Sequence, residues 1–202
     1  MDQGLNLRFP LDRFYEADNR PLPAISQVDG DAIPAPYRAL LVGNHDMTPT
    51  LEAFHGDRII IQTLDRRHEL TQPEVEAGEI PRSRPGTECG SRDVETLGRI
   101  VVLLLKGSTK PVEFGAIIIH LDLVPPEARE RILECRVPFG TILATYCIEH
   151  ISRPRAFIRV EPDALIANTL GLTKPVTLYG RRNVISNLHN EVLADIIEIL
   201  PP

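Results

Sequence analysis

Charged residues inside apolar segments are the part of this sequence best suited to chemistry. Arg99 stands directly before the most apolar run of the chain, residues 100–105, and Glu198 lies between isoleucines in the last such run. A buried charge without a partner is too costly to keep. Each of these groups must therefore reach water, pair with an opposite charge or receive a charged ligand, and the choice at Arg99 decides what the protein can bind.

Glu198 has two interpretations. Strand alternation places it on the same face as Ile196 and Leu200, so that face carries both apolar bulk and one acid. In the first interpretation the strand lies at a sheet edge and Glu198 points to solvent. In the second, Glu198 pairs with Arg99 or with the pair at 181–182 and forms a small polar pocket within the sheet.

Arg181 and Arg182 are adjacent in a segment with the pattern of a strand. Their side chains must point to opposite faces, so at most one of them can enter a given cavity. One solvated and one ion-paired arginine is the simpler interpretation. For the cavity residue, the sequence favours Arg182 slightly, as a ligand-binding group.

Other potential ligands form no metal-binding pattern. His45, Asp46 and His55 surround a helix start, where Asp46 is more simply a local cap. The three cysteines are odd in number and widely spaced, which indicates reduced thiols rather than a disulfide framework or a zinc site: Cys89, Cys135 and Cys147. Motifs for nucleotide binding, metalloproteases and serine hydrolases are absent from the sequence, so we expect no metal and no cofactor.

Composition favours one globular domain spanning residues 1–202, with residues 1–35 as an N-terminal arm. The chain has 202 residues, of which 43% are hydrophobic and 25% charged. Its formal net charge of −6 argues against nucleic-acid binding but leaves room for a local anion site. Neither a secretory signal nor a membrane span is visible in the sequence, so a soluble cytoplasmic protein is expected.

A buried hairpin is the central predicted element, with strands at 100–105 and 112–120 around a turn-rich break. The remaining elements are predicted as helices at 37–43, 48–56 and 125–135, strands at 58–66, 156–160, 177–186 and 191–200, helical turns at 163–170, a second apolar segment at 137–149 and a long exposed excursion at 69–95. Strands joined by short turns outnumber the helices, so the fold class is α+β, with one mainly antiparallel sheet and helices packed on it.

Four segments in order resemble the chorismate pyruvate-lyase family. The stretch Asp46-Met-Thr-Pro-Thr-Leu-Glu-Ala-Phe, followed by a strand, resembles that family's opening helix and strand. The later segments are Val137-Pro-Phe-Gly-Thr-Ile-Leu, Tyr179-Gly-Arg-Arg-Asn-Val-Ile and Ile196-Ile-Glu-Ile-Leu-Pro. The resemblance runs from about Leu40 to Pro201, apart from the excursion.

This resemblance implies a six-stranded antiparallel sheet, a buried ligand cavity under helical flaps, and conversion of chorismate to 4-hydroxybenzoate and pyruvate without metal or cofactor. Carried over by position, Arg99 clamps the ring carboxylate and Glu198 faces the ring oxygen, which makes these two the catalytic residues. Met47 becomes a cavity wall, and Phe139 contributes through its backbone beside Gly140. A guanidinium fork suits a carboxylate because it donates two parallel hydrogen bonds.

Two departures leave alternatives open. Aligning on the hairpin turn moves the family's clamp position to Val101, which shares a strand face with Arg99. Phe139 replaces the family's usual leucine. The chain is therefore a chorismate lyase, a non-catalytic protein that binds an aromatic acid, or an enzyme for another enolpyruvyl or hydroxybenzoyl compound. In each case the expected partner is a small aromatic or enolpyruvyl carboxylic acid.

Overall fold

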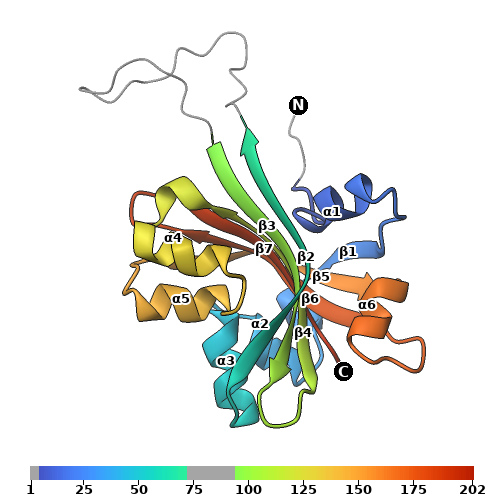
Figure 1. Cartoon of the computed structure of the whole chain (residues 1–202). Coiled ribbons are helices and arrows are strands. Elements are labelled where there is room, and N and C mark those ends of the chain that lie inside the picture. Colours follow the sequence, from blue (N-terminus) through green and yellow to red (C-terminus); the bar gives the residue numbers. More distant parts are fainter. Residues whose placement is uncertain (1–4, 72–93) are drawn as a thin grey trace.

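The computed structural model describes residues 5–71 and 94–202, which form one seven-stranded sheet with helices on both faces (Figure 1). The strands are β1 (Ala24–Val28), β2 (Ile59–Thr71), β3 (Val94–Leu105), β4 (Pro111–His120), β5 (Ile151–Glu161), β6 (Leu178–Ser186) and β7 (Val192–Leu200). The helices are α1 (Leu11–Ala17), α2 (Tyr37–Leu41), α3 (Met47–His55), α4 (Pro126–Leu133), α5 (Phe139–Thr145) and α6 (Ala164–Thr169), with single 3-10 turns at Gly30–Ala32 and Leu121–Leu123. The predicted α+β class is confirmed.

The strand order is β1-β5-β6-β7-β4-β3-β2, and every neighbouring pair is antiparallel. The predicted central hairpin is β3–β4, and the predicted C-terminal hairpin is β6–β7. These two hairpins meet where β4 pairs with β7, so the last strand of the chain lies at the centre of the sheet. The edge-strand interpretation of Glu198 is therefore wrong, because β7 has a paired strand on both sides.

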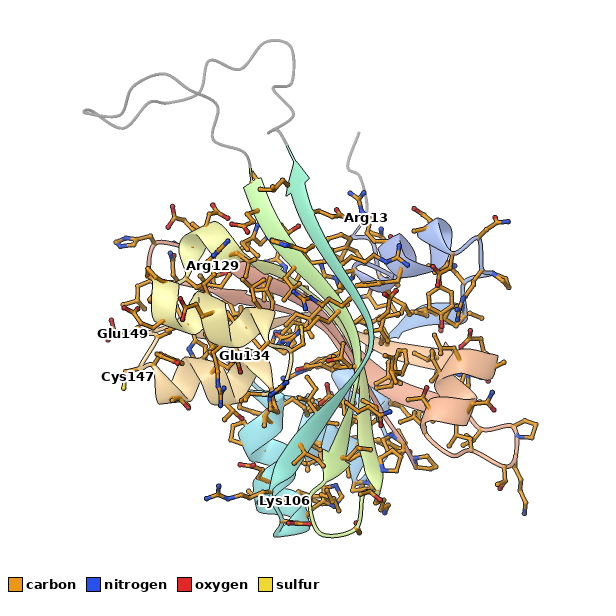
Figure 2. All side chains as sticks on the ribbon, in the orientation of Figure 1. Arg13, Lys106, Arg129, Glu134, Cys147 and Glu149 are labelled. Atoms are coloured by element: carbon orange, nitrogen blue, oxygen red, sulfur yellow. The ribbon has the colours of Figure 1, made fainter. Side chains whose placement is uncertain are left out.

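Each face of the sheet has its own core. On one face, α4 and α5 pack on β3, β4, β6 and β7, and α2 and α3 cover the adjoining part. On the other face, α1 and α6 pack against the opposite side chains of the same strands. Charged side chains lie on the outer surface of the helices, such as Arg129 of α4 and Glu134 directly after it (Figure 2). Glu134 forms an exposed ion pair with Arg131. This two-sided burial explains why the central strands are apolar along both faces.

The N-terminal region does more than lie on the domain as an arm. Its strand β1 pairs with β5 and adds the seventh strand, beyond the six that the resemblance implied. Helix α1 buries Phe14 and Tyr15 in the core of its face, and the Tyr15 hydroxyl donates a hydrogen bond of 3.0 Å to Asp163. The sequence signal here was weak because both elements are short.

Two helices near the site differ from their predicted bounds. Helix α3 begins at Met47, one residue before the predicted start at Thr48, and Asp46 occupies its N-cap position. Gly56 ends this helix in the left-handed conformation (φ 64°), as predicted. Helix α5 starts directly after Pro138, so the predicted turn around Gly140 is the first turn of a helix.

The excursion predicted for residues 69–95 lies outside the described residues except at its ends, which extend β2 to Thr71 and start β3 at Val94. Within the described part of the chain, no helix is both long and apolar enough to cross a membrane.

Candidate functional site

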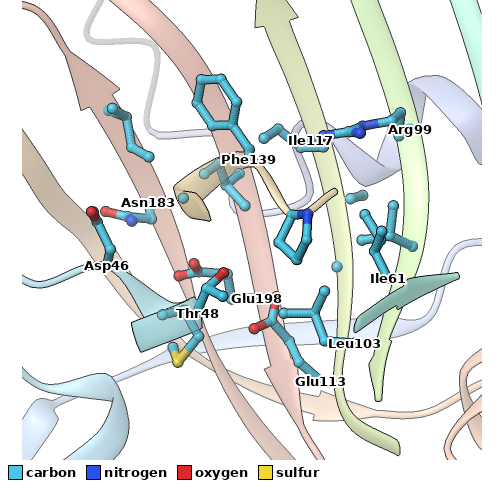
Figure 3. A pocket seen from close by; sticks show the side chains of 18 residues that line it. Asp46, Thr48, Ile61, Arg99, Leu103, Glu113, Ile117, Phe139, Asn183 and Glu198 are labelled. Atoms are coloured by element: carbon cyan, nitrogen blue, oxygen red, sulfur yellow. The ribbon is translucent and has the colours of Figure 1, made fainter. Parts of the chain in front are cut away.

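A cavity of about 60 Å³ lies between the sheet and the helices α3 and α5. Its floor is built from β3, β4, β6 and β7, and the start of each helix closes it from the other side (Figure 3). The polar residues among its lining are few, and they come from five different elements: Asp46, Thr48, Arg99, Glu113, Asn183 and Glu198. The rest of the lining is mainly apolar, so these groups have little access to water.

Arg99 enters the cavity from β3 as a buried cation. Only 1% of its surface is exposed, and its Nε and Nη1 atoms have no hydrogen-bond partner among residues 5–71 and 94–202. Burial lowers the pKa of Arg99, and contact with the Cys135 thiol offsets part of that effect. Val101 lines the same cavity, so either alignment of the clamp position points into it. Arg99 thus offers unused donors to an anion.

Glu198 lines the same cavity as Arg99, and Ile196 lines it from the same face of β7, in keeping with the strand alternation. Its carboxylate pairs with Arg181, which stands directly opposite it on β6 and is completely buried. The interpretation in which Glu198 joins a polar pocket within the sheet is therefore confirmed. Its partner is Arg181 and not Arg99.

Arg181 also holds the connection between α2 and α3 against the sheet. Its guanidinium donates hydrogen bonds to the backbone carbonyls of Leu41 (3.3 Å), Gly43 (3.2 Å) and His45 (2.8 Å). These carbonyls end α2 and lead into α3. One buried side chain therefore orients Glu198 and fixes the segment that carries Met47 to the cavity.

Arg182 does not reach the cavity, so the slight preference for it was wrong. Its side chain lies on the opposite face, where its Nη2 donates to Asp195 (2.7 Å) and its guanidinium stacks on Phe9. Adjacent strand residues point to opposite faces, as predicted, and Arg181 is the one on the face of Glu198, where it pairs with that carboxylate behind the cavity lining. The identity of that residue depends on the pairing of β6 with β7, which alternation alone does not give.

Glu113 is a second buried carboxyl group that the sequence reasoning missed. It extends from β4 into the cavity, 4% of its surface is exposed, and its Oε2 has no hydrogen-bond partner in the described structure. Burial raises its pKa well above the usual range, and repulsion by Glu198 adds to the rise, while Arg181 opposes it. Both effects favour the protonated form of the Glu113 carboxyl group over the charged one.

Two sequence signals for Glu113 were available. It is an acid within the second strand of the central hairpin, between Val112 and Phe114, as unusual there as Glu198 is in its own strand. Gly115 follows two residues later on the same face, and a Cβ at that position would lie 3.1 Å from Oε1 of Glu113. The glycine thus leaves space for the carboxyl group.

The helices supply the residues that the resemblance assigned to the flap. Met47, Phe139 and Gly140 all line the cavity, and the first two side chains are buried. A Cβ at Gly140 would lie 3.4 Å from the hydroxyl oxygen of Thr48. The starts of α3 and α5 therefore approach closely over the cavity, and the ligand-binding roles of these residues stay predictions.

A further polar group lies where α3 begins. Oδ2 of Asp46 and Nε2 of His150 are 2.8 Å apart, and Oδ1 of Asp46 has no partner within the described ranges. Burial disfavours the charged form of His150, but the Ile148 carbonyl and the Asp46 carboxylate outweigh it and raise the pKa of His150. Asp46 makes no side-chain cap to its own helix, which departs from the predicted local cap.

In the part of the chain that the structure describes, no three His, Cys, Asp or Glu side chains lie where they could hold a metal ion together. The site offers a buried arginine on one strand, two of whose nitrogens have no partner in the described structure, and two carboxyl groups on other strands, around a small, mostly apolar cavity. Such an arrangement fits a small organic acid.

No protein-family model matches the chain, and no curated protein sequence matches it. Solved structures do match. The gene product SA0254 from Staphylococcus aureus subsp. aureus N315 aligns at 8% identity and a TM-score of 0.52, over 80% of this chain and 90% of that one. PhnF from Mycobacterium smegmatis aligns at 13% identity and a TM-score of 0.52, over 79% of this chain.

The match to PhnF concerns one part of that protein. This chain covers 64% of the PhnF chain but 90% of its separately solved effector domain, which aligns at 13% identity and a TM-score of 0.51. At such low identity these likenesses establish a shared fold and nothing finer.

Proposed function

We propose that this protein binds a small aromatic or enolpyruvyl carboxylic acid in the cavity and, as a chorismate-lyase-like enzyme, eliminates pyruvate from chorismate to give a hydroxybenzoate. The observation that carries the proposal is Arg99. A fully desolvated guanidinium with two unused nitrogens is unfavourable in the ligand-free protein. A carboxylate ligand removes that cost by accepting two parallel hydrogen bonds.

Glu198 supports the same assignment from the other side of the cavity. Its carboxylate is held by Arg181 and lies in the position where the resemblance places the group that faces the ring oxygen. A ligand anchored by Arg99 at one end would thus be oriented by Glu198 at the other.

The reaction asks little of the protein beyond this positioning. Elimination breaks the bond between the ring and the enolpyruvyl oxygen and removes hydrogen from the neighbouring ring carbon. The ring becomes aromatic, and the released enolpyruvate takes up a proton to become pyruvate. Because aromaticity drives the reaction, holding the reactive conformer and stabilising the developing charge account for catalysis, without a cofactor.

Ligand entry requires the helices to move. The cavity volume of about 60 Å³ is far below the roughly 300 Å³ at which ligand pockets usually begin. Helices α3 and α5 have nine and seven residues and cover the cavity with Met47 and Phe139. These short helices are the elements that open, in agreement with the flap role that the resemblance gives them.

The test is release of pyruvate from chorismate by the purified protein, followed with a coupled dehydrogenase. We expect Arg99→Ala and Glu198→Gln each to lower the rate by about a hundredfold or more. Arg153→Ala is the matched control, since this exposed arginine lies on the opposite face of the sheet, and it should leave the rate unchanged. Chorismate that binds to the wild-type protein without any release of pyruvate contradicts the lyase.

A non-catalytic binding domain is the second candidate, favoured by the fold that this chain shares with the PhnF effector domain. In that case 4-hydroxybenzoate raises the melting temperature, because a ligand that binds only the native state stabilises it, while chorismate is left intact. An enzyme for another enolpyruvyl or hydroxybenzoyl compound is distinguished by mass analysis of the small molecule that copurifies with the protein.

A further inference from the structure

The Glu113 carboxyl group has no role in the function proposed above, yet its burial lowers the stability of the ligand-free protein. It is buried, one oxygen is unpaired within the described structure, and Gly115 leaves space for it. Buried polar atoms are normally satisfied, so an unpaired one that faces a cavity indicates a ligand contact.

The charged groups around Glu113 give it no partner of its own. Glu198 on β7 repels a second negative charge. The Arg181 guanidinium is already occupied by Glu198 and three backbone carbonyls. The other charged groups of the cavity are Arg99 on β3 and Asp46 at the start of α3, and neither forms an ion pair with Glu113 in the described structure.

The strand register places Glu113 far from Arg99. Arg99 pairs with Ile117 on β4, and Glu113 lies four residues further along that strand. At about 3.3 Å per residue, the two backbone positions are about 13 Å apart along the sheet. The arginine and the buried acid therefore mark two separate ends of one cavity (Figure 3).

We infer that Glu113 is held as a carboxylic acid and forms, together with the Glu198 carboxylate, a subsite for the uncharged oxygen of a ligand whose carboxylate binds Arg99. Glu113 donates its proton in a hydrogen bond to that oxygen, and Glu198 accepts one from it. A hydroxyl group can serve both, since it is donor and acceptor at once. This inference rests on the proposed function, because it assumes that Arg99 receives the carboxylate.

The subsite defines a ligand class more narrowly than Arg99 does. It favours a monocarboxylic acid with a hydroxyl group at its far end. Benzoate has no hydroxyl group to pair with the buried acid, and an unpaired buried polar group strongly weakens binding. A dicarboxylate such as terephthalate brings a second anion to a place where Glu198 already holds a negative charge, so it is rejected.

Calorimetry on the full chain at about pH 7 tests the ligand class, with 4-hydroxybenzoate, benzoate and terephthalate as probes. Wild type should bind 4-hydroxybenzoate about tenfold or more tighter than benzoate, with no binding of terephthalate. Glu113→Gln keeps this preference, because an amide also donates a hydrogen bond. Glu113→Leu keeps only the hydrogen bond to Glu198, so its preference should be several-fold smaller than that of wild type, and an undiminished preference in Glu113→Leu overturns the inference.

Infrared spectroscopy tests the protonation without any ligand. The C=O stretch of a protonated carboxyl group should be present in wild type at about pH 7 and absent from Glu113→Gln, whereas an unchanged spectrum overturns the inference. Equal binding of benzoate and 4-hydroxybenzoate to wild type overturns the Glu113 subsite and leaves Arg99 as the carboxylate site. Binding of neither acid overturns the proposed function along with it.

Discussion

Replacing Glu113 with glutamine should remove a pH dependence from the stability of the protein. The pKa of Glu113 lies well above its ordinary value of 4.5 because of burial and the nearby Glu198 charge. Between 4.5 and the raised pKa, the native protein keeps a proton that the unfolded chain has released. The free energy of unfolding of wild type therefore falls as pH rises through this window, by about 1.4 kcal/mol per pH unit.

Glutamine is neutral at every pH, so the free energy of unfolding of the variant does not fall in this way as pH rises. Near pH 4.5 the two proteins should be about equally stable, and at each higher pH unit within the window the variant should gain about 1.4 kcal/mol over wild type. The two carboxyl groups interact, so the slope reports their joint titration. Urea unfolding at several pH values measures the difference directly.

The matched control is Glu130→Gln, since Glu130 is exposed on α4 and makes no side-chain hydrogen bond or ion pair that the described structure records. Its stability should run parallel to that of wild type. A constant difference between Glu113→Gln and wild type across the pH range would refute the reasoning, because it would mean that Glu113 ionises at its ordinary pKa inside the cavity.

Three further substitutions test the other charges. Arg99→Met should raise the free energy of unfolding of the ligand-free protein by about 1–4 kcal/mol in urea titrations, while it abolishes binding of 4-hydroxybenzoate; a loss of stability would mean that Arg99 is structural. Arg181→Ala should lower it by about 3–5 kcal/mol, because it strips Glu198 of its partner, and unchanged unfolding would contradict the buried pair. The pKa of His150 is raised, so its contact with Asp46 stabilises the protein at low pH, and this contribution is lost as pH rises through the folded-state pKa. His150→Gln should therefore lower the free energy of unfolding only at pH values below that pKa.

The contrast between Arg99 and Arg181 shows how far sequence reasoning reached. Alternation placed Glu198 on the face of Ile196 and Leu200 but left open whether that face meets Arg99, because it does not say how the two hairpins pair. The pairing of β4 with β7 brings the two residues to one face of the sheet. The sequence could not show which arginine is satisfied. That depends on three carbonyls at the end of α2 and in the loop after it, more than 130 residues away in the chain.

The register of the β6–β7 hairpin decides which of the two arginines lies on the face of Glu198. The pair nearest the turn is Ser186 with Val192, and this register continued without a break would put Arg182 on the face of Glu198. The register shifts by one residue between Ile185 and Ser186, so Arg181 stands opposite Glu198 instead. A bulge of this kind reverses the facing of every residue beyond it, and the apolar pattern of the strand does not reveal it.

Arg99 and Glu113 together allow a last test of whether the cavity is built for a ligand. Each is a buried group with an unpaired atom in the described structure, and each should cost the ligand-free protein stability. They lie about 13 Å apart along the sheet, beyond the range within which substitutions usually interact. In the double variant Arg99→Met with Glu113→Leu, the gains in unfolding free energy at neutral pH should therefore add to within about 0.5 kcal/mol.

The same double variant should bind neither benzoate nor 4-hydroxybenzoate, although it is more stable than wild type. Strongly non-additive gains would show that the two groups already interact across the empty cavity, and the two-ended ligand site would then be wrong. Additive gains with loss of binding support a protein that keeps two unfavourable groups because one ligand satisfies both.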